Sequence, residues 1–275
     1  MLHVGRWNSL PVALIDPAGA HFRLPQGELL LPTREVPPGC QVGDRLEVFV
    51  YPKSGDELAV TLRKPLAQVG EFAYLKVVQV SRVGVFLDWG LEKDLLVPYS
   101  EQPERMRLGR KYLVKLCFDN RQRIVATARI DQCLEPPPAD LQAGDQVALL
   151  LWAFTDLGAK MIINDLYAGL LYRDELRSGL HCGSRLTGYI KCRREDGKVD
   201  LTLRRVGRDG VADAQQGLLA ALSVTGMLPL HDGSPPELIR EQLGMSKKTF
   251  KKAVGGLYRA GRIELLEDGI RLKKS

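Results

Sequence analysis

The sequence predicts a mainly β protein with a C-terminal α+β domain. Up to about residue 205 the dominant hydrophobic period is two, in short runs rich in Val, Leu, Ile and aromatic residues. The same order of runs recurs three times, each time over about 60 to 65 residues. Beyond that point the apolar residues adopt helical spacing. These observations predict three tandem small barrels of five short strands each, followed by a helical domain.

Three runs in which polar and apolar residues alternate occupy the same place in each repeat. Each run follows a glycine and a polar residue, at Gly43, Gly109 and Gly183. Alternation of this kind is typical of a half-buried antiparallel strand, and a second run after a short turn predicts a hairpin. A third matching patch lies upstream of each pair. The paired runs are 45–51 with 58–62, 111–116 with 124–128, and 185–191 with 199–203, and the upstream patches are 28–32, 94–98 and 169–172.

Breaks in composition predict where the domains begin and end. The proline-rich stretch 134–140 favours polyproline II and predicts a semi-rigid linker. The first two repeats join almost directly through 64–66, so we expect them to pack against one another. The expected domains are a divergent first barrel at 1–64, a second barrel at 65–133, the linker at 134–140, a third barrel at 141–206 and the helical domain at 212–275.

The C-terminal segment predicts three helices and a hairpin. The first helix is expected over 212–223. Ser234 and Glu237 have capping-box spacing, with proline at the first helical position, and predict the start of a second helix that ends at Gly244. Ser246 can cap a third helix, which Gly261 stops. Two short strands, 262–266 and 270–273, complete a winged helix whose second and third helices resemble a helix-turn-helix.

The repeats resemble a known family. In the second repeat, residues 83–88 (VGVFLD) stand where S1 domains have Phe-Gly-Ala-Phe-Val, and residues 96–101 (LVPYSE) stand where they have Leu-Val-His-x-Ser-Glu. The third repeat matches through 157–160 and 169–176. Three S1-like units of the OB type followed by a winged helix resemble the conserved virulence factor B family of bacterial RNA-binding proteins. This resemblance implies single-stranded RNA binding in post-transcriptional or translational regulation, without an enzymatic activity.

Composition and residue spacing argue against other function classes. The chain has 39 Lys and Arg against 33 Asp and Glu, and its net charge of +6 favours polyanionic partners. Its five cysteines are an odd number without zinc-knuckle spacing, and its four histidines are scattered. No phosphate-binding loop motif is present. We therefore expect no catalytic site, no metal and no cofactor, and the absence of a long apolar run predicts a cytoplasmic protein without membrane contact.

The barrels supply the first set of candidate RNA-binding residues, because such barrels bind single strands through aromatic faces and cations. In the third repeat, Tyr172 stands at the position of the S1 family's histidine, and Lys160 is expected in the strand opposite. In the second repeat, Phe86 stands at the family's second phenylalanine. An alternative is that Phe154 is a core residue and that the charges are a solvated face. The full set is Phe154, Lys160, Tyr172, Arg173, Lys191 and Arg193 in the third repeat, and Lys76, Arg82, Phe86 and Trp89 in the second.

The third helix of the winged domain supplies a second set. Three- and four-residue spacings place its lysines along neighbouring faces. Such a face can contact phosphates of RNA or DNA. The expected partner is single-stranded RNA, with mRNA and the ribosome as candidate sources. The alternatives are a solubilising face, or a DNA-binding transcriptional regulator whose winged helix reads duplex DNA and whose barrels bind protein. The oligomeric state is left open. The residues are Lys247, Lys248, Lys251, Lys252, Arg259 and Arg262.

Overall fold

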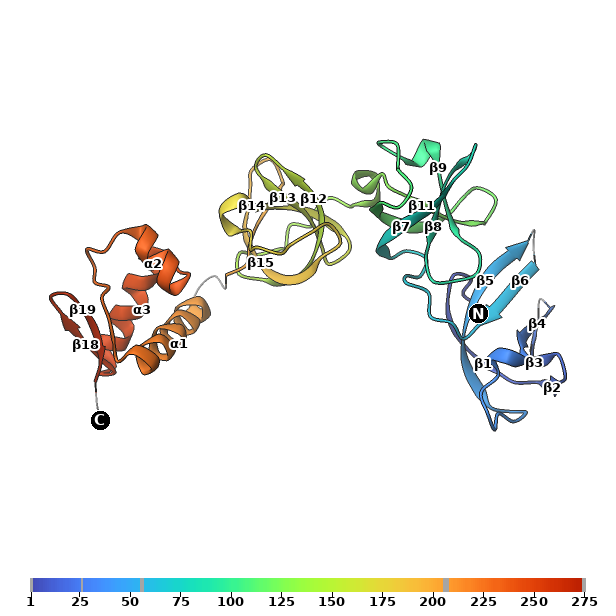
Figure 1. Ribbon diagram of the computed structural model, residues 1–275, viewed down its shortest axis with the longest axis horizontal. Helices are drawn as coiled ribbons and strands as arrows, with labels where there is room; N and C mark the ends of the chain where they lie inside the picture. Colours follow the sequence, from blue (N-terminus) through green and yellow to red (C-terminus); the bar gives the residue numbers. More distant parts are fainter. Residues whose placement is uncertain (1, 26, 55–56, 205–207, 274–275) are drawn as a thin grey trace. The chain divides into compact units, whose positions relative to one another are not determined.

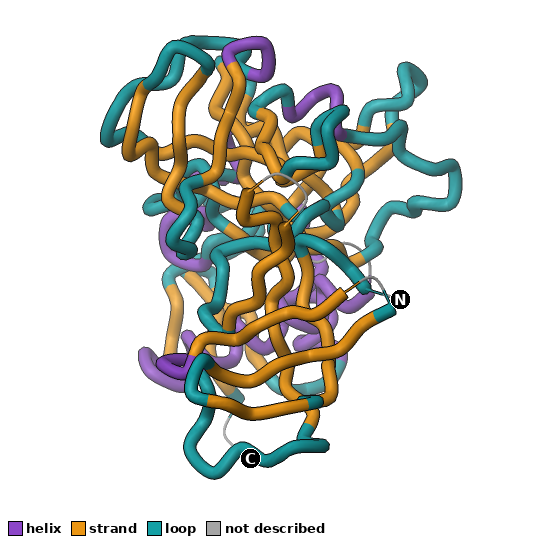
Figure 2. The backbone as a smooth tube through the Cα atoms, turned by 90° about the vertical axis from the view of Figure 1, so that its right-hand side faces the viewer, coloured by secondary structure: helices purple, strands orange, loops and turns teal. Residues whose placement is uncertain are grey.

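A computed structural model describes residues 2–25, 27–54, 57–204 and 208–273 (Figure 1). Strands predominate up to residue 202, and the long helices of the described residues follow it (Figure 1). Figure 2 shows the strands in orange and the helices in purple. The chain forms two compact units, Met1–Pro137 with Ala148–Leu186, and Pro138–Val147 with Thr187–Ser275. Among the described residues, no helix is long and apolar enough to cross a membrane.

The first repeat does not close into the five-stranded barrel that the sequence predicts. Strands β1 (Arg6–Pro11), β5 (Arg45–Ser54) and β6 (Glu57–Thr61) form one sheet, and β2 (Leu14–Asp16), β3 (Gly19–Leu24) and β4 (Gly27–Pro32) form another. The two sheets enclose a common core, whose largest members include Phe22 and Leu31. The predicted strands are therefore present, but the β4 and β6 edges are not paired with each other in either sheet.

A side-chain contact at the end of β6 distinguishes this open barrel from the second repeat. At the end of β6, the Leu62 amide donates to the Glu35 carboxylate at 2.9 Å. At the matching point of the second repeat, the Ala128 amide donates to the backbone carbonyl of Glu101, also at 2.9 Å. The longer carboxylate bridge replaces the direct backbone bond. The described residues of these two edge strands, β4 and β6, form no ladder with each other.

The second repeat is a closed barrel, as predicted. Its strands follow the order β10-β11-β9-β8-β7, and a parallel pair between Val125 and Leu96 completes the ring. The core of this barrel continues into the first repeat, where the Phe49 ring lies 5.9 Å from that of Trp89. The expectation that the first two repeats pack together is confirmed. The strands are β7 (Phe72–Val80), β8 (Gly84–Asp88), β9 (Leu95–Pro98), β10 (Lys111–Phe118) and β11 (Ile124–Thr127).

The third repeat is also a closed barrel, with the strand order β12-β13-β14-β16-β15. The proline-rich stretch before it is not a free spacer at its beginning. The Glu135 amide donates to the Leu166 carbonyl at 2.9 Å, and Glu135 forms an isolated bridge with Tyr167. The strands are β12 (Gln146–Thr155), β13 (Gly158–Ile163), β14 (Tyr167–Tyr172), β15 (Arg185–Arg193) and β16 (Val199–Thr202).

Each of the three repeats has a glycine at the same structural position. Gly19, Gly84 and Gly158 each begin the second long strand of their repeat, with φ of 148°, 159° and 151°. A Cβ atom at any of them would overlap a carbonyl oxygen of the next strand, from Leu31, Val97 or Leu171. Only glycine allows two strands to approach this closely. The residues that face these glycines are Pro32, Pro98 and Tyr172.

The C-terminal domain is a winged helix, as predicted. Its core gathers Leu218, Leu222, Ile239, Phe250 and Leu257 from all three helices. The first helix begins at residue 208, earlier than the expected 212, and a short additional strand, β17, joins the hairpin in the order β17-β19-β18. The elements are α1 (Arg208–Thr225), β17 (Met227–Leu228), α2 (Pro236–Leu243), α3 (Lys247–Arg259), β18 (Ile263–Leu266) and β19 (Gly269–Leu272).

One of the two predicted helix caps is confirmed. The Ser246 hydroxyl caps α3 and accepts a hydrogen bond from the Thr249 amide at 3.2 Å. The predicted cap of α2 is wrong, because its N-cap is Pro235 and no side chain caps it. Ser234 is buried, and its hydroxyl instead accepts from the His231 amide at 2.9 Å. Ser234 therefore stabilises the turn before α2, whereas the capping-box spacing predicted that it would cap the helix.

Candidate nucleic-acid interface

The outer face of β13 and β14 presents Lys160 and Tyr172 together. In the antiparallel register, Lys160 faces Leu170 and Gly158 faces Tyr172. Facing residues share a side of the sheet, and so do residues two apart along a strand. Lys160 and Tyr172 therefore share the outer side. The intervening Ala159 is fully buried in the barrel.

Trp152 adds an aromatic ring to this face, and sequence reasoning missed it. The register of β12 with β13 shifts between Leu151 and Ala153, so Trp152 is the extra residue of a β-bulge. The Lys160 ammonium lies 4.9 Å from the centre of the Trp152 ring, in a cation–π contact. A large aromatic inside the apolar run 147–154 is the only sequence signal, and such runs usually indicate core.

Phe154 does not share the face of Lys160 and Tyr172, contrary to the grouping expected from the sequence. It pairs with the buried Ala159 and therefore lies on the opposite side of the sheet. It is nonetheless 51% exposed, at the end of β12 beside the exposed Leu157. Arg173 is exposed and follows Tyr172 directly, at the start of a short 3-10 turn.

Lys191 and Arg193 are both exposed on β15, but not for the expected reason. The register of β15 with β16 shifts between Ile190 and Cys192, so Lys191 is the extra residue of a second bulge. The prediction that two residues two apart share a side fails wherever a bulge interrupts the alternation. The Arg193 guanidinium donates to the Pro138 carbonyl at 3.4 Å.

The corresponding face of the second barrel has fewer aromatic and cationic side chains. Phe86 lies two residues after Gly84, as Lys160 lies two residues after Gly158, and it is partly exposed. Pro98 takes the place of Tyr172. Lys76 and Arg82 are exposed, Lys76 in β7 and Arg82 in the turn that follows it.

Trp89 does not belong to this surface, which corrects the sequence prediction. Only 3% of it is exposed, because the first repeat covers its ring through Phe49. Its indole N–H donates to the Lys93 carbonyl at 2.6 Å. Tyr99, which sequence reasoning missed, is the exposed aromatic next to Pro98, and the Arg105 guanidinium lies 5.7 Å from its ring centre.

The corresponding face of the first repeat carries carboxylates. His21 occupies the position of Lys160 and Phe86, two residues after Gly19. Its ring nitrogens lie 3.0 Å from Asp16 and 3.2 Å from Glu28. The nearby His21 ring lowers the pKa of Asp16, so that carboxylate is charged at neutral pH. Two carboxylates beside this position disfavour a phosphate.

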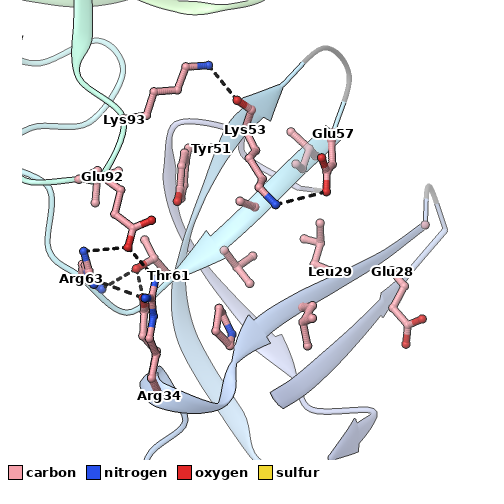
Figure 3. A pocket seen from close by; sticks show the side chains of 18 of the residues that line it. Glu28, Leu29, Arg34, Tyr51, Lys53, Glu57, Thr61, Arg63, Glu92 and Lys93 are labelled. Atoms are coloured by element: carbon pink, nitrogen blue, oxygen red, sulfur yellow. Dashed lines mark hydrogen bonds and ion pairs between the residues drawn. The ribbon is translucent and has the colours of Figure 1, made fainter. Parts of the chain in front are cut away.

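A cavity of about 560 Å³ lies along the unpaired edges of β4 and β6 (Figure 3). Its charged lining is balanced in sign. Arg34 and Arg63 both pair with Glu92, at 2.6 and 3.3 Å, and Lys53 pairs with Glu57 at 3.8 Å. These ion pairs leave little net field to attract a polyanion.

The lysines of α3 lie on the side of the helix that faces solvent. Phe250, Ala253, Val254 and Leu257 form the buried side. At about 100° per residue, Lys248, Lys252 and Arg259 point away from that side. Lys251 is also exposed and lies 3.2 Å from Asp232, whereas Lys247 is half-buried. Arg262 is exposed beyond the helix, directly before β18.

Comparisons with known proteins identify both domain types. A model of the S1 domain matches residues 4–63 and 69–129, and a model of the CvfB-like winged helix domain matches residues 216–272. The first repeat thus matches S1 domains in sequence although its barrel is open. Tandem S1 domains followed by a winged helix define a class of protein built from nucleic-acid-binding domains, which are typically non-enzymatic.

Two curated relatives cover most of the chain. The uncharacterized protein YitL of Bacillus subtilis is 30% identical over 257 residues, 88% of this chain and 85% of the relative. Conserved virulence factor B of Staphylococcus epidermidis is 25% identical over 243 residues, 85% of this chain and 82% of the relative. The chain belongs to the conserved virulence factor B family. A solved multidomain protein with nucleic acid binding domains from Streptococcus pneumoniae covers 98% of each chain at 23% identity, with a TM-score of 0.43.

Proposed function

We propose that this protein is a non-catalytic, cytoplasmic single-stranded RNA-binding protein that acts in bacterial post-transcriptional or translational regulation. One observation carries the proposal. On the outer face of the third barrel, the Lys160 ammonium lies over the Trp152 ring, and Tyr172 shares the face of Lys160. Aromatic faces stack unpaired bases, and a neighbouring cation binds the phosphates between them.

The choice of single-stranded RNA over duplex DNA rests on the same chemistry. A duplex hides the base faces that a stacking platform requires. On α3 the exposed basic residues are mainly lysines, which act as point charges without a base preference. Such a face supports contact with the phosphate backbone of mRNA or ribosomal RNA.

A second candidate function is duplex DNA binding by the winged helix. The observation that favours it is the cationic outer side of α3, the second helix of a helix-turn-helix. In that case the barrels would bind a partner protein. Few exposed side chains on α3 suit base edges, which favours the RNA proposal.

The first prediction is that the protein binds a single RNA strand of about 20 nucleotides at least about tenfold more tightly than a duplex DNA of equal length, because only the single strand can stack on the barrels. Fluorescence anisotropy measures both affinities. Affinity should fall between about 50 and 200 mM KCl, since phosphate contacts release counterions. Equal binding of both nucleic acids, or indifference to salt, contradicts the proposal. Degradation of the RNA during incubation with Mg²⁺ contradicts the non-catalytic part.

A further inference from the structure

Two adjacent glycines in the middle of α3, Gly255 and Gly256, have different surroundings. Glycine is the least favourable residue in a helix interior after proline. At Gly256, a Cβ atom would overlap the side-chain amide of Gln215 in α1, which is the end of a flexible side chain and would have to move aside. At Gly255, a Cβ atom would meet no atom within 4 Å. The fold therefore does not explain Gly255.

Gly255 lies at the centre of an exposed and mostly cationic patch. On a helix surface the nearest neighbours of a residue are three and four positions away. For Gly255 these are Lys251, Lys252, Tyr258 and Arg259, all of them exposed. Tyr258 is 54% exposed. The Arg259 side chain folds back, and its Nε donates to the Gly255 carbonyl at 3.1 Å. We call these five residues the α3 saddle.

The missing side chain leaves helix backbone accessible between these groups. A polymer chain can lie closer to a helix at glycine than at any other residue. The lysines and the arginine surround that point of close approach with positive charge. The ion pair between Lys251 and Asp232 does not prevent this, because a surface ion pair contributes little and exchanges readily.

We propose that the α3 saddle seats the sugar–phosphate backbone of a single nucleic-acid strand directly on the helix at Gly255. Lys251, Lys252 and Arg259 bind the flanking phosphates, and the Tyr258 ring stacks an unpaired base. An exposed aromatic within the phosphate-binding patch favours a single strand over a duplex, whose bases are already stacked. This inference rests on the proposed nucleic-acid binding and assigns α3 a backbone contact instead of base-edge reading.

The test is to fill the saddle with a neutral side chain. In the full chain, Gly255→Gln should weaken binding of an oligouridylate of about 20 nucleotides by about fivefold or more, measured by anisotropy. Gly217→Gln is the matched control, because Gly217 also lies inside a helix, α1, with open space where a Cβ atom would be; Gly217 is exposed and Gly255 is partly exposed. It should change affinity by less than about twofold. Glutamine is a better helix former than glycine, so both variants should melt no lower than the unaltered protein.

Four outcomes overturn the inference. If the unaltered protein binds RNA and Gly255→Gln binds equally well, the saddle is wrong while the proposed function stands. The same holds if both variants weaken binding to the same extent. If Gly255→Gln impairs duplex DNA binding more than RNA binding, the single-strand assignment is wrong. Failure of the unaltered protein to bind RNA overturns the proposed function and the saddle together.

Discussion

Lys160 and Phe86 occupy the same position in two consecutive barrels, two residues after a strand-initial glycine. In the third barrel a bulge adds Trp152 beneath the lysine, and Tyr172 follows on the next strand. In the second barrel a proline replaces that tyrosine. Under the proposed function, single residues would therefore decide which of two similar folds offers the more complete stacking platform.

This difference leads to a prediction about two matched pairs of substitutions. Lys160→Ala with Tyr172→Ala should weaken RNA binding by about tenfold or more, since stacking contributes about 1–3 kcal/mol per base. Lys76→Ala with Phe86→Ala should weaken it less. Circular dichroism checks that both variants are folded, and anisotropy gives the affinities. A larger loss in the second-barrel pair would show that the main platform is assigned to the wrong barrel.

Among the elements, the hairpin of β13 and β14 contains a close approach between the backbones of its two strands at Gly158. Gly158 has a φ of 151°, and a Cβ atom there would overlap the Leu171 carbonyl. Gly197, in the turn between β15 and β16, also has a positive φ, of 79°, but a Cβ atom there would meet nothing. A substitution at Gly158 would therefore cost both backbone strain and steric overlap, whereas a substitution at Gly197 would cost backbone strain alone.

We expect Gly158→Ala to lower the free energy of unfolding of the third barrel by about 3 kcal/mol or more, because strain and overlap both act. Gly197→Ala should cost only about 1 kcal/mol, from strain alone. Urea denaturation of the two variants measures both values. Equal costs would mean that the strands can separate at Gly158 without penalty, so the close approach would not be needed.

For the whole molecule, the connection between the third barrel and the winged helix is short. β16 ends at Thr202 and α1 begins at Arg208, so residues 203–207 join them. A fully extended segment of this length reaches about 18 Å. If both modules bind RNA as proposed, such a tether would present them to one RNA strand at high effective concentration.

We therefore predict that the two modules bind RNA as one surface. The fragment 139–275 should bind at least about tenfold more tightly than either 139–206 or 207–275, compared at one salt concentration. The affinity of the long fragment should be higher because the tether makes the second RNA contact intramolecular. Should the long fragment bind no better than its stronger half, the winged helix would be a separate docking module.

The sequence by itself determined the order of strands and helices, the threefold repeat and the winged helix. These features could be predicted because the hydrophobic period, the glycine turns and the Ser246 cap depend on interactions between residues close together in the sequence. The sequence also predicted that Lys160 and Tyr172 share a face, and the register of β13 with β14 places both on one side of the sheet.

Only the tertiary structure decided the remaining features. The first barrel is open, and the Leu62 amide there donates to the carboxylate of Glu35, 27 residues earlier in the chain. The burial of Trp89 depends on the packing of one repeat against another. The bulges at Trp152 and Lys191 shift the alternation of side chains between the two faces of the sheet, and the local sequence pattern does not predict them. Each of these features depends on contacts between residues far apart in the chain, which local propensity and hydrophobic period do not encode.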